Sequence, residues 1–321
     1  MAQRGWQMAD IGTMFGAEGA PAGFMGLPRS QSLGAAEGAG VVLLGAGSAT
    51  PYASVGAYCA DGPAAIRAGA APYAANLGHV NFDLGRPIVP EGAVVVDAGD
   101  LPCDPARAAA SRAEIGSALR AILGRGASAV LLGGDDSVQI PMIEAAGVLG
   151  RPVTIVQIDA HIDWRDEVQG ERLGLSSTMR RASEMAHVGQ MIQIGARGIG
   201  SARPADLADA RRRGVRLVTA ADLAAGGIAA ALGAIPEGGD ILVCFDFDAL
   251  DPAVMPAVIG RTAGGLRYDD WLGLMRGIAR KGRIAAVGMV EFMPGRDIDG
   301  QGATVAAQAA AAVLGILAAQ G

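Results

Sequence analysis

Cysteine is scarce in this 321-residue chain, and negative charge outweighs positive charge. The three cysteines, Cys59, Cys103 and Cys244, are too few and too scattered for a disulfide framework or a zinc ribbon, which fits a reducing cytoplasm. A formal net charge of −6 argues against nucleic acid or an acidic membrane surface as the main partner. We therefore expect a cytoplasmic protein whose main partner is a small molecule.

Several common sequence signals are also missing. The first ten residues lack a basic region followed by an apolar run, so no signal peptide is expected. The longest apolar stretch, residues 301–320, contains Thr304 and Gln308 and is typical of a C-terminal helix packed on a sheet rather than of a membrane span. No G-x-S-x-G motif, phosphate-binding loop or dinucleotide fingerprint follows any expected strand.

Short apolar runs alternate with helix-like stretches from residue 41 onward. Continuous apolar runs, each followed by a helix, are typical of a parallel sheet covered on both faces. No linker divides this pattern. We predict an irregular arm over residues 1–37, which contacts a neighbouring subunit or the rim of a site, and a single α/β domain over residues 38–321. The strands are expected at 41–45, 93–97, 129–132, 153–158, 191–195, 215–218, 241–245 and 284–290, and the helices at 61–71, 105–123, 138–149, 204–213, 220–232 and 268–279.

The run Val153–Ile158 ends in Asp159, His161 and Asp163 at alternate positions. Alternate residues of an extended backbone point to one side, so two carboxylates and an imidazole converge. Such a group is costly to bury unless a cation binds it. Alone, the pattern fits a solvated charged loop equally well, and the other strand ends decide between the two interpretations.

Acidic residues follow three further strands. Asp246 and Asp248 share one side of the backbone after residues 241–245, and Asp136 follows the two glycines at 133–134. Asp136 or Ser137 could instead cap the next helix. Glu291 ends the run 284–290, where it could recognise a cationic group or pair with an arginine.

In open parallel sheets, ligands bind at the carboxyl ends of the strands. Five carboxylates within a few ångströms cannot all remain ionised without cations. Two divalent ions would neutralise them, and oxygen-rich ligation with one imidazole suits manganese, with nickel possible and zinc less favoured. Ions bridged by Asp159 and Asp246 would lower the pKa of a shared water. The expected ligands are Asp136, Asp159, His161, Asp163, Asp246 and Asp248.

Three segments, 133–137 (GGDDS), 159–163 (DAHID) and 245–252 (FDFDALDP), resemble the three metal-binding signatures of the ureohydrolases, the family of arginase and agmatinase. The resemblance is closest to the agmatinase-like branch and extends from about residue 24 onward. It implies a three-layer α/β/α fold with a mostly parallel eight-stranded sheet, assembly into homo- or hetero-oligomers such as trimers or hexamers, and two Mn²⁺ ions, or Ni²⁺ in some members.

The resemblance also implies a role for each site residue. Asp136, Asp159, Asp163 and Asp246 would hold one ion, and His161, Asp159, Asp246 and Asp248 the other. Glu291 would face the guanidinium group of the substrate. A metal-bridging hydroxide would attack the guanidinium carbon, and the tetrahedral intermediate would give urea, or a substituted urea, and an amine. Asp163 is the best placed residue to move the proton of the hydroxide.

Two residues depart from the family pattern. Asp136 stands where the first motif usually has histidine. Leu175 replaces the histidine of a Ser–His–Gly segment that precedes a paired arginine, although Arg180 and Arg181 are kept. We expect Leu175, Ser176 and Arg180 to line the substrate site. The loss of the histidine favours a guanidino acid or a biguanide such as metformin over agmatine, and is similar to a two-subunit branch that hydrolyses metformin.

Two alternatives remain open at this point. The same departures suit a non-catalytic or weakly active subunit of a hetero-oligomeric ureohydrolase. A related class of amidohydrolase, the histone deacetylase type, uses one zinc ion and paired histidines. The chain has only three histidines, none of them adjacent, which disfavours that class.

Overall fold

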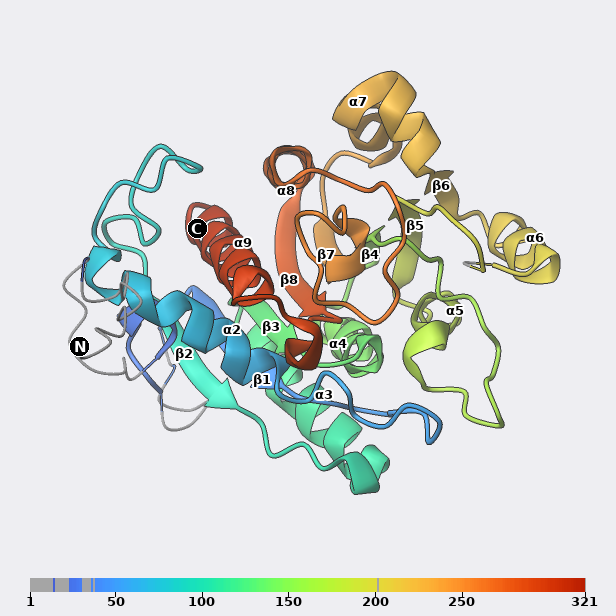
Figure 1. The fold of residues 1–321 in the computed structure, drawn as a ribbon, viewed down its shortest axis with the longest axis horizontal. Coiled ribbons are helices and arrows are strands. Elements are labelled where there is room, and N and C mark those ends of the chain that lie inside the picture. Colours follow the sequence, from blue (N-terminus) through green and yellow to red (C-terminus); the bar gives the residue numbers. More distant parts are fainter. Residues whose placement is uncertain (1–13, 15–22, 31–35, 37, 201, 321) are drawn as a thin grey trace, which may run out of the picture.

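The computed structural model describes residues 14, 23–30, 36, 38–200 and 202–320. Its centre is a sheet of eight strands, and every strand pairing in it is parallel (Figure 1). The strand order is β2-β1-β3-β8-β7-β4-β5-β6. The strands are β1 (Val41–Ala46), β2 (Val95–Asp100), β3 (Ser128–Gly133), β4 (Val153–Ile158), β5 (Val188–Ile194), β6 (Arg216–Val218), β7 (Asp240–Asp246) and β8 (Arg283–Val290).

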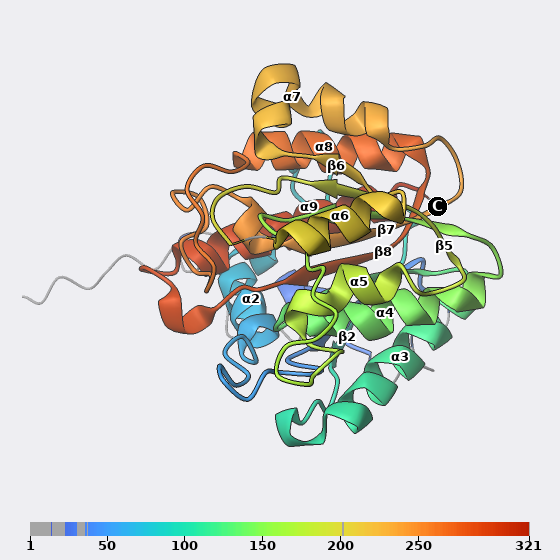
Figure 2. The same cartoon turned by 90° about the vertical axis from the view of Figure 1, so that its right-hand side faces the viewer.

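Helices cover both faces of the sheet, which confirms the three-layer α/β/α prediction. Figure 2 shows α7 and α8 on one side of the sheet and α3 and α4 on the other. The helices are α2 (Gly62–Ala70), α3 (Ala108–Gly124), α4 (Gln139–Ala145), α5 (Thr178–Ala182), α6 (Pro204–Arg212), α7 (Ala220–Ala234), α8 (Tyr268–Lys281) and α9 (Gln301–Ala318).

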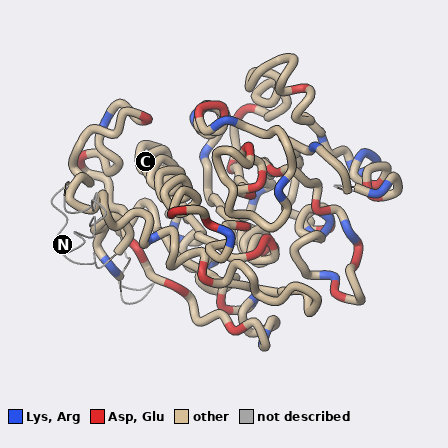
Figure 3. Tube along the Cα trace, in the orientation of Figure 1, with Lys and Arg blue, Asp and Glu red and all other residues tan. Residues whose placement is uncertain are grey.

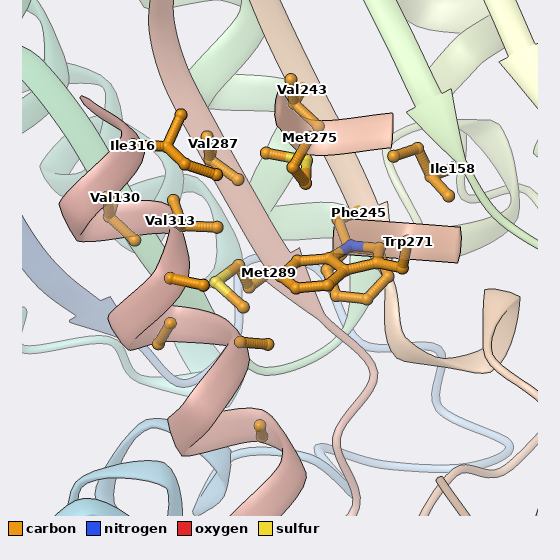
Figure 4. Close-up of a cluster of buried hydrophobic side chains, with 14 of the residues drawn as sticks. Val130, Ile158, Val243, Phe245, Trp271, Met275, Val287, Met289, Val313 and Ile316 are labelled. Carbon is orange, nitrogen blue, oxygen red and sulfur yellow. The ribbon is translucent and has the colours of Figure 1, made fainter. Parts of the chain in front are cut away.

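Two separate hydrophobic cores form because alternate strand residues face opposite layers. In β1, Val41 and Leu43 belong to the core under α2, α8 and α9, whereas Val42 and Leu44 belong to the core under α3 and α4. Figure 4 shows the first core, where Trp271 of α8 packs on Phe245 of β7 with ring centroids 5.1 Å apart. Continuous apolar strands are therefore needed, as the sequence pattern indicated.

The predicted elements differ from the structure at a few boundaries. The expected helix 138–149 is divided, with α4 flanked by short 3-10 turns at Asp136–Val138 and Ala146–Leu149. Helix α5 was not predicted, because its five residues are too few to show a helical period. The short strand β6 covers only the last three of the four residues expected at 215–218.

The apolar C-terminal stretch forms α9, which packs on the sheet. By length and composition alone α9 could cross a membrane, with a mean hydropathy of 1.5, but 67% of it is buried inside the protein. Burial of this kind is typical of a core helix, so the sequence interpretation of residues 301–320 holds.

Most of the predicted N-terminal arm lies outside the described residues. The described segment 23–30 packs against the body of its own chain: Phe24 and Leu27 are buried in the core under α2 and α9. The Phe24 N–H donates to Asp97 Oδ2 at 2.8 Å, and Asp97 also pairs with Arg67. These eight residues thus belong to the domain rather than to an extended arm.

Close backbone contact between two loops requires glycine at position 134. A Cβ built on Gly134 would lie 1.7 Å from the carbonyl oxygen of Gly47. We expect Gly134→Ala to destabilise the protein by on the order of 3 kcal/mol or more, because backbone atoms must move. Gly233→Ala in α7, where a Cβ meets nothing within 4 Å, should be neutral or stabilise by about 0.5–1 kcal/mol. Thermal unfolding of both variants checks this, and equal Tm values would contradict it.

Candidate metal centre

The carboxyl ends of four neighbouring strands carry the acidic residues that the sequence analysis selected. Strands β3, β8, β7 and β4 are adjacent in the sheet, so the residues that follow them meet at one edge. In Figure 3 several acidic segments from separate parts of the chain gather near the centre of the view. The residues after these strands include Asp136, Asp159, His161, Asp163, Asp246, Asp248 and Glu291, and all but Asp159 line one cavity of about 220 Å³.

After β3, the two neighbouring aspartates have different roles. Asp135, rather than Asp136 or Ser137, caps the following turn: its side chain accepts hydrogen bonds from the Ser137 N–H at 3.1 Å and from Ser48 Oγ at 2.7 Å. Asp136 is therefore free for the cavity. One of its oxygens, Oδ1, accepts a hydrogen bond from Gln139, and the other, Oδ2, is buried with no partner.

After β4, a chain of two buried glutamines orients the carboxylates. The Nε2 group of Gln157 donates to Asp159 Oδ2 at 2.7 Å and to Asp163 Oδ2 at 2.6 Å. Gln193 of β5 donates in turn to Gln157 Oε1 and to the carbonyl of Ile162 at 2.8 Å. Because the Ile162 carbonyl can only accept, the group of Gln193 that contacts it must be the Nε2 donor. The atom of Gln157 that faces Gln193 is therefore the acceptor Oε1, and the N–H groups of Gln157 point toward the acids.

After β7, the alternation of side chains places two aspartates on the same side. Phe247 points into the core, where its ring contacts Phe245 with centroids 4.9 Å apart. Asp246 and Asp248 face the other way, and Asp246 Oδ1 accepts the Asp248 N–H at 2.7 Å. Asp248 Oδ2 lies 2.9 Å from His161 Nδ1, which joins this loop to the loop after β4.

Glu291 follows β8 in a left-handed backbone conformation, with a φ of 68°. Its side chain is 4% exposed. It accepts the Asp136 N–H at 2.8 Å, and both its oxygens accept from the Tyr58 hydroxyl at 2.7 and 2.9 Å. No arginine pairs with Glu291 in the described part of the chain. The alternative from the sequence, pairing with an arginine, is thus not observed among the described residues, and recognition of a cationic group stays a prediction.

The cluster shifts the protonation of its members strongly. Burial and the charge of Asp159 raise the pKa of Asp136 to about 8. Burial, followed by the charges of neighbouring aspartates, also raises the pKa of Asp163 and of Asp246 well above the usual range. Burial opposes the charge of His161, but hydrogen bonds to Asp159 and Asp248 raise its pKa to about 11. Burial likewise opposes ionisation of Asp159, yet the His161 hydrogen bond lowers its pKa to about 2.

These donors fit divalent cations. Asp136 Oδ2 lacks any partner despite complete burial, and Asp159, His161 and Asp248 each offer a ligand atom within 4.8 Å of the others. Cations placed among the carboxylates would remove the repulsion that otherwise forces some of them to bind protons. Oxygen donors with one imidazole nitrogen suit a hard or intermediate divalent ion such as Mn²⁺.

The predicted substrate contacts are only partly brought together. Leu175 and Ser176 line the cavity, and the Ser176 N–H donates to the Tyr52 hydroxyl at 3.2 Å. Arg180 does not line it: its guanidinium is committed to Asp209 and Glu184, so the prediction that Arg180 contacts substrate is corrected.

Sequence reasoning missed several residues of the site. The cavity is lined by, among others, Tyr58, Trp164, Arg165 and Asp206. Gln157 does not line it but donates a hydrogen bond to Asp159. Gln157 had a readable signal, because it is a polar residue in a buried strand and lies two positions before Asp159, on the same side. Tyr58 had none, since its partner Glu291 is 233 residues away.

Comparison with known proteins identifies the class. The chain matches the Arginase family over residues 39–315 and belongs to that family. A human mitochondrial guanidino acid hydrolase is 29% identical over 236 residues, which is 72% of this chain and 66% of that protein. A guanidinopropionase from Pseudomonas aeruginosa is 32% identical over 66% of this chain and 68% of its own length.

Solved structures agree with this assignment. A hypothetical agmatinase from Burkholderia thailandensis superimposes with a TM-score of 0.78 at 26% identity, over 92% of this chain and 90% of the other. Proclavaminate amidino hydrolase from Streptomyces clavuligerus gives the same TM-score and identity over 95% and 99% of the two chains. The resemblance to an agmatinase-like ureohydrolase, and the arginase-like fold it implied, are confirmed.

The glutamine chain predicts a specific loss of metal affinity. Gln157→Met keeps the length of the side chain but removes the donors that hold Asp159 and Asp163 in place. We expect the affinity for Mn²⁺ to fall about 10–100-fold, as for other groups that orient metal ligands. Titration calorimetry of the metal-free protein measures this. Gln190→Met, on the exposed part of β5, is the matched control, and equal affinities in the two variants would contradict the role.

The raised pKa values predict that the metal-free protein loses stability as the pH rises. A group whose pKa is higher in the folded state stabilises the fold below its unfolded pKa, and that stabilisation is lost as the pH rises through the folded pKa. For Asp136 the window runs from 3.8 to about 8, and for His161 from 6.5 to about 11. The pKa of Asp159, lowered to about 2, contributes stability that is constant above its ordinary value of 3.8 and is lost only as the pH falls below it, so it does not change the slope at higher pH.

We expect the Tm of chelator-treated protein to fall between about pH 5 and about pH 9 and that of Mn²⁺-loaded protein to change much less. Scanning calorimetry at a series of pH values checks both curves. Asp136→Asn should reduce the slope of the metal-free curve. A Tm of the metal-free protein that rises over this range would be incompatible with the cluster as described.

Proposed function

We propose that this chain is a metal-dependent hydrolase that cleaves a C–N bond of a guanidino compound, releasing urea or a substituted urea and an amine. The observation that carries the proposal is a set of five aspartates and one histidine, with four of the aspartates buried, around a cavity that Glu291 also lines. The names of the relatives, among them a guanidino acid hydrolase and a guanidinopropionase, support this class of substrate.

Two divalent ions, Mn²⁺ or alternatively Ni²⁺, would supply a water activated at neutral pH and held beside the substrate. We assign one ion to Asp136, Asp159, Asp163 and Asp246, and the other to Asp159, His161, Asp246 and Asp248. The unpartnered Oδ2 of Asp136 supports a ligand role for this carboxylate in place of histidine. The expected location, the cytoplasm, and an oligomeric assembly remain part of this proposal.

The chain's own residues perform the remaining tasks. Glu291 would face the cationic guanidinium, and the Tyr58 hydroxyl and the Asp136 N–H hold its carboxylate in one orientation. Burial favours this ion pairing because water cannot screen it. Asp163 would accept the proton of the attacking water and deliver it to the departing amine, since its carboxylate lines the cavity beside the other proposed ligands. A left-handed backbone, with a φ of 42°, directs Asp163 into the cavity.

A second candidate function follows from Leu175. An apolar side chain lines the cavity where the family motif has a histidine, which suits a non-catalytic or weakly active partner subunit in a hetero-oligomer. The complete set of metal donors favours the active enzyme. Purification of the chain alone, followed by native mass spectrometry and a turnover assay, separates the two, because an active homo-oligomer excludes the silent subunit.

We expect Mn²⁺-loaded protein to release urea, or a substituted urea, from at least one compound in a panel of guanidino acids, agmatine and biguanides. Asp159→Asn and Asp246→Asn should each lower kcat by about a thousandfold or more, because each variant removes a negative ligand shared by both ions. A colorimetric urea assay and amine detection measure this. Asp251→Asn, in the same sequence motif but outside the cavity lining, is the control and should keep its activity. Full activity in the Asp159 and Asp246 variants would refute the proposal.

A further inference from the structure

Among the described residues that line the acidic cavity, Arg165 is the one arginine or lysine. Arg165 shares the cavity with Asp163 and Glu291. The backbone N–H of Arg165 donates to the carbonyl of Ser176 at 2.9 Å, and this bond fixes the loop of Arg165 against the loop that carries Leu175. The Arg165 side chain is 24% exposed, whereas Glu291 is 4% exposed. Glu291 is therefore more deeply buried than Arg165, and we call the end of the cavity beside Glu291 its floor.

The carboxylate that pairs with Arg165 is shared with a second arginine. Its Nη1 pairs with Asp206 Oδ2 at 2.5 Å. The same Asp206 oxygen also accepts from the backbone N–H and the Nε of Arg203, at 3.2 and 3.1 Å. Two guanidinium groups thus share one carboxylate. Among the described residues Arg165 has no other carboxylate partner, and a guanidinium carries five N–H donors, so most of its donors remain for a ligand.

We propose that Arg165 selects substrates with a carboxylate at the end opposite the guanidinium, that is, short ω-guanidino acids. This rests on the proposed function, since it takes the guanidinium group of the substrate to lie at the floor beside Glu291. The carboxylate of the substrate would then reach Arg165 and accept two parallel hydrogen bonds, a geometry that arginine offers and lysine does not.

Substrates with a cationic tail are disfavoured by the same arrangement. The ammonium group of agmatine would approach the charge of Arg165, and Asp206, the carboxylate that pairs with Arg165, is already shared by two arginines. The cavity of about 220 Å³ is also small compared with the roughly 300–1,000 Å³ of sites for drug-sized ligands, which favours a short chain between the two ends of the substrate.

Three compounds of similar length test this: 4-guanidinobutanoate, agmatine and the uncharged-tail compound butylguanidine. We expect kcat/KM for 4-guanidinobutanoate to exceed that for agmatine at least about tenfold. Arg165→Met should raise KM for 4-guanidinobutanoate by about tenfold or more with little change in kcat, and should leave butylguanidine unaffected. Arg165→Glu should shift the preference toward agmatine.

Arg172→Met is the matched control, because Arg172 lies nearby in the sequence, pairs with Asp166 and does not line the cavity. The proposal would be overturned if the parent protein hydrolyses agmatine as efficiently as 4-guanidinobutanoate. It would also be overturned if Arg165→Met lowers kcat/KM equally for all three compounds. Calorimetric binding to Mn²⁺-loaded protein separates it from the proposed function. If 4-guanidinobutanoate binds in a way that depends on Arg165 but is not turned over, the carboxylate subsite is supported and only the hydrolase activity is contradicted. If 4-guanidinobutanoate and agmatine bind equally well, the subsite is overturned.

Discussion

Mutual repulsion among buried carboxylates is the constraint on which the rest of this structure depends. Asp136, Asp159, Asp246 and Asp248 are each 5% exposed or less, and they meet at the edge of a sheet whose strands are apolar. Without cations the cluster is tolerable only if some members bind protons and His161 carries a positive charge. Divalent ions would relieve that repulsion, and we propose that they activate water at the same position.

Hydrogen bonds from neighbouring side chains and backbone groups hold these acids close together despite their repulsion. Gln193 fixes Gln157, which fixes Asp159 and Asp163, while Asp135 takes over the capping role that would otherwise occupy Asp136. Glu291 is held at the same edge by a backbone N–H and a tyrosine hydroxyl. Elsewhere in the cavity, Arg165 pairs with Asp206, which Arg203 also contacts. A guanidino group would thus meet acids at the floor, and a carboxylate tail would meet Arg165.

The sequence predicted the eight strands and the convergence of Asp136, Asp159, Asp163, Asp246 and Asp248 because both depend on local patterns. Apolar runs specify buried parallel strands, and residues at alternate positions after a strand share a side. The contact between Tyr58 and Glu291 could not be predicted, because it joins residues 233 positions apart. Arg180 was misplaced for a related reason: a paired arginine in the sequence does not show that Asp209 and Glu184 bind its guanidinium.

The most direct test of the account is the number of metal ions that each chain binds. Protein purified without chelator, dialysed against Mn²⁺ and then against metal-free buffer, is analysed by inductively coupled plasma mass spectrometry alongside an Asp159→Asn variant. We expect about two ions per parent chain and a loss of both in the variant, because Asp159 is assigned to both ions. A parent chain that retains no divalent metal, or a variant that retains two ions, would contradict it.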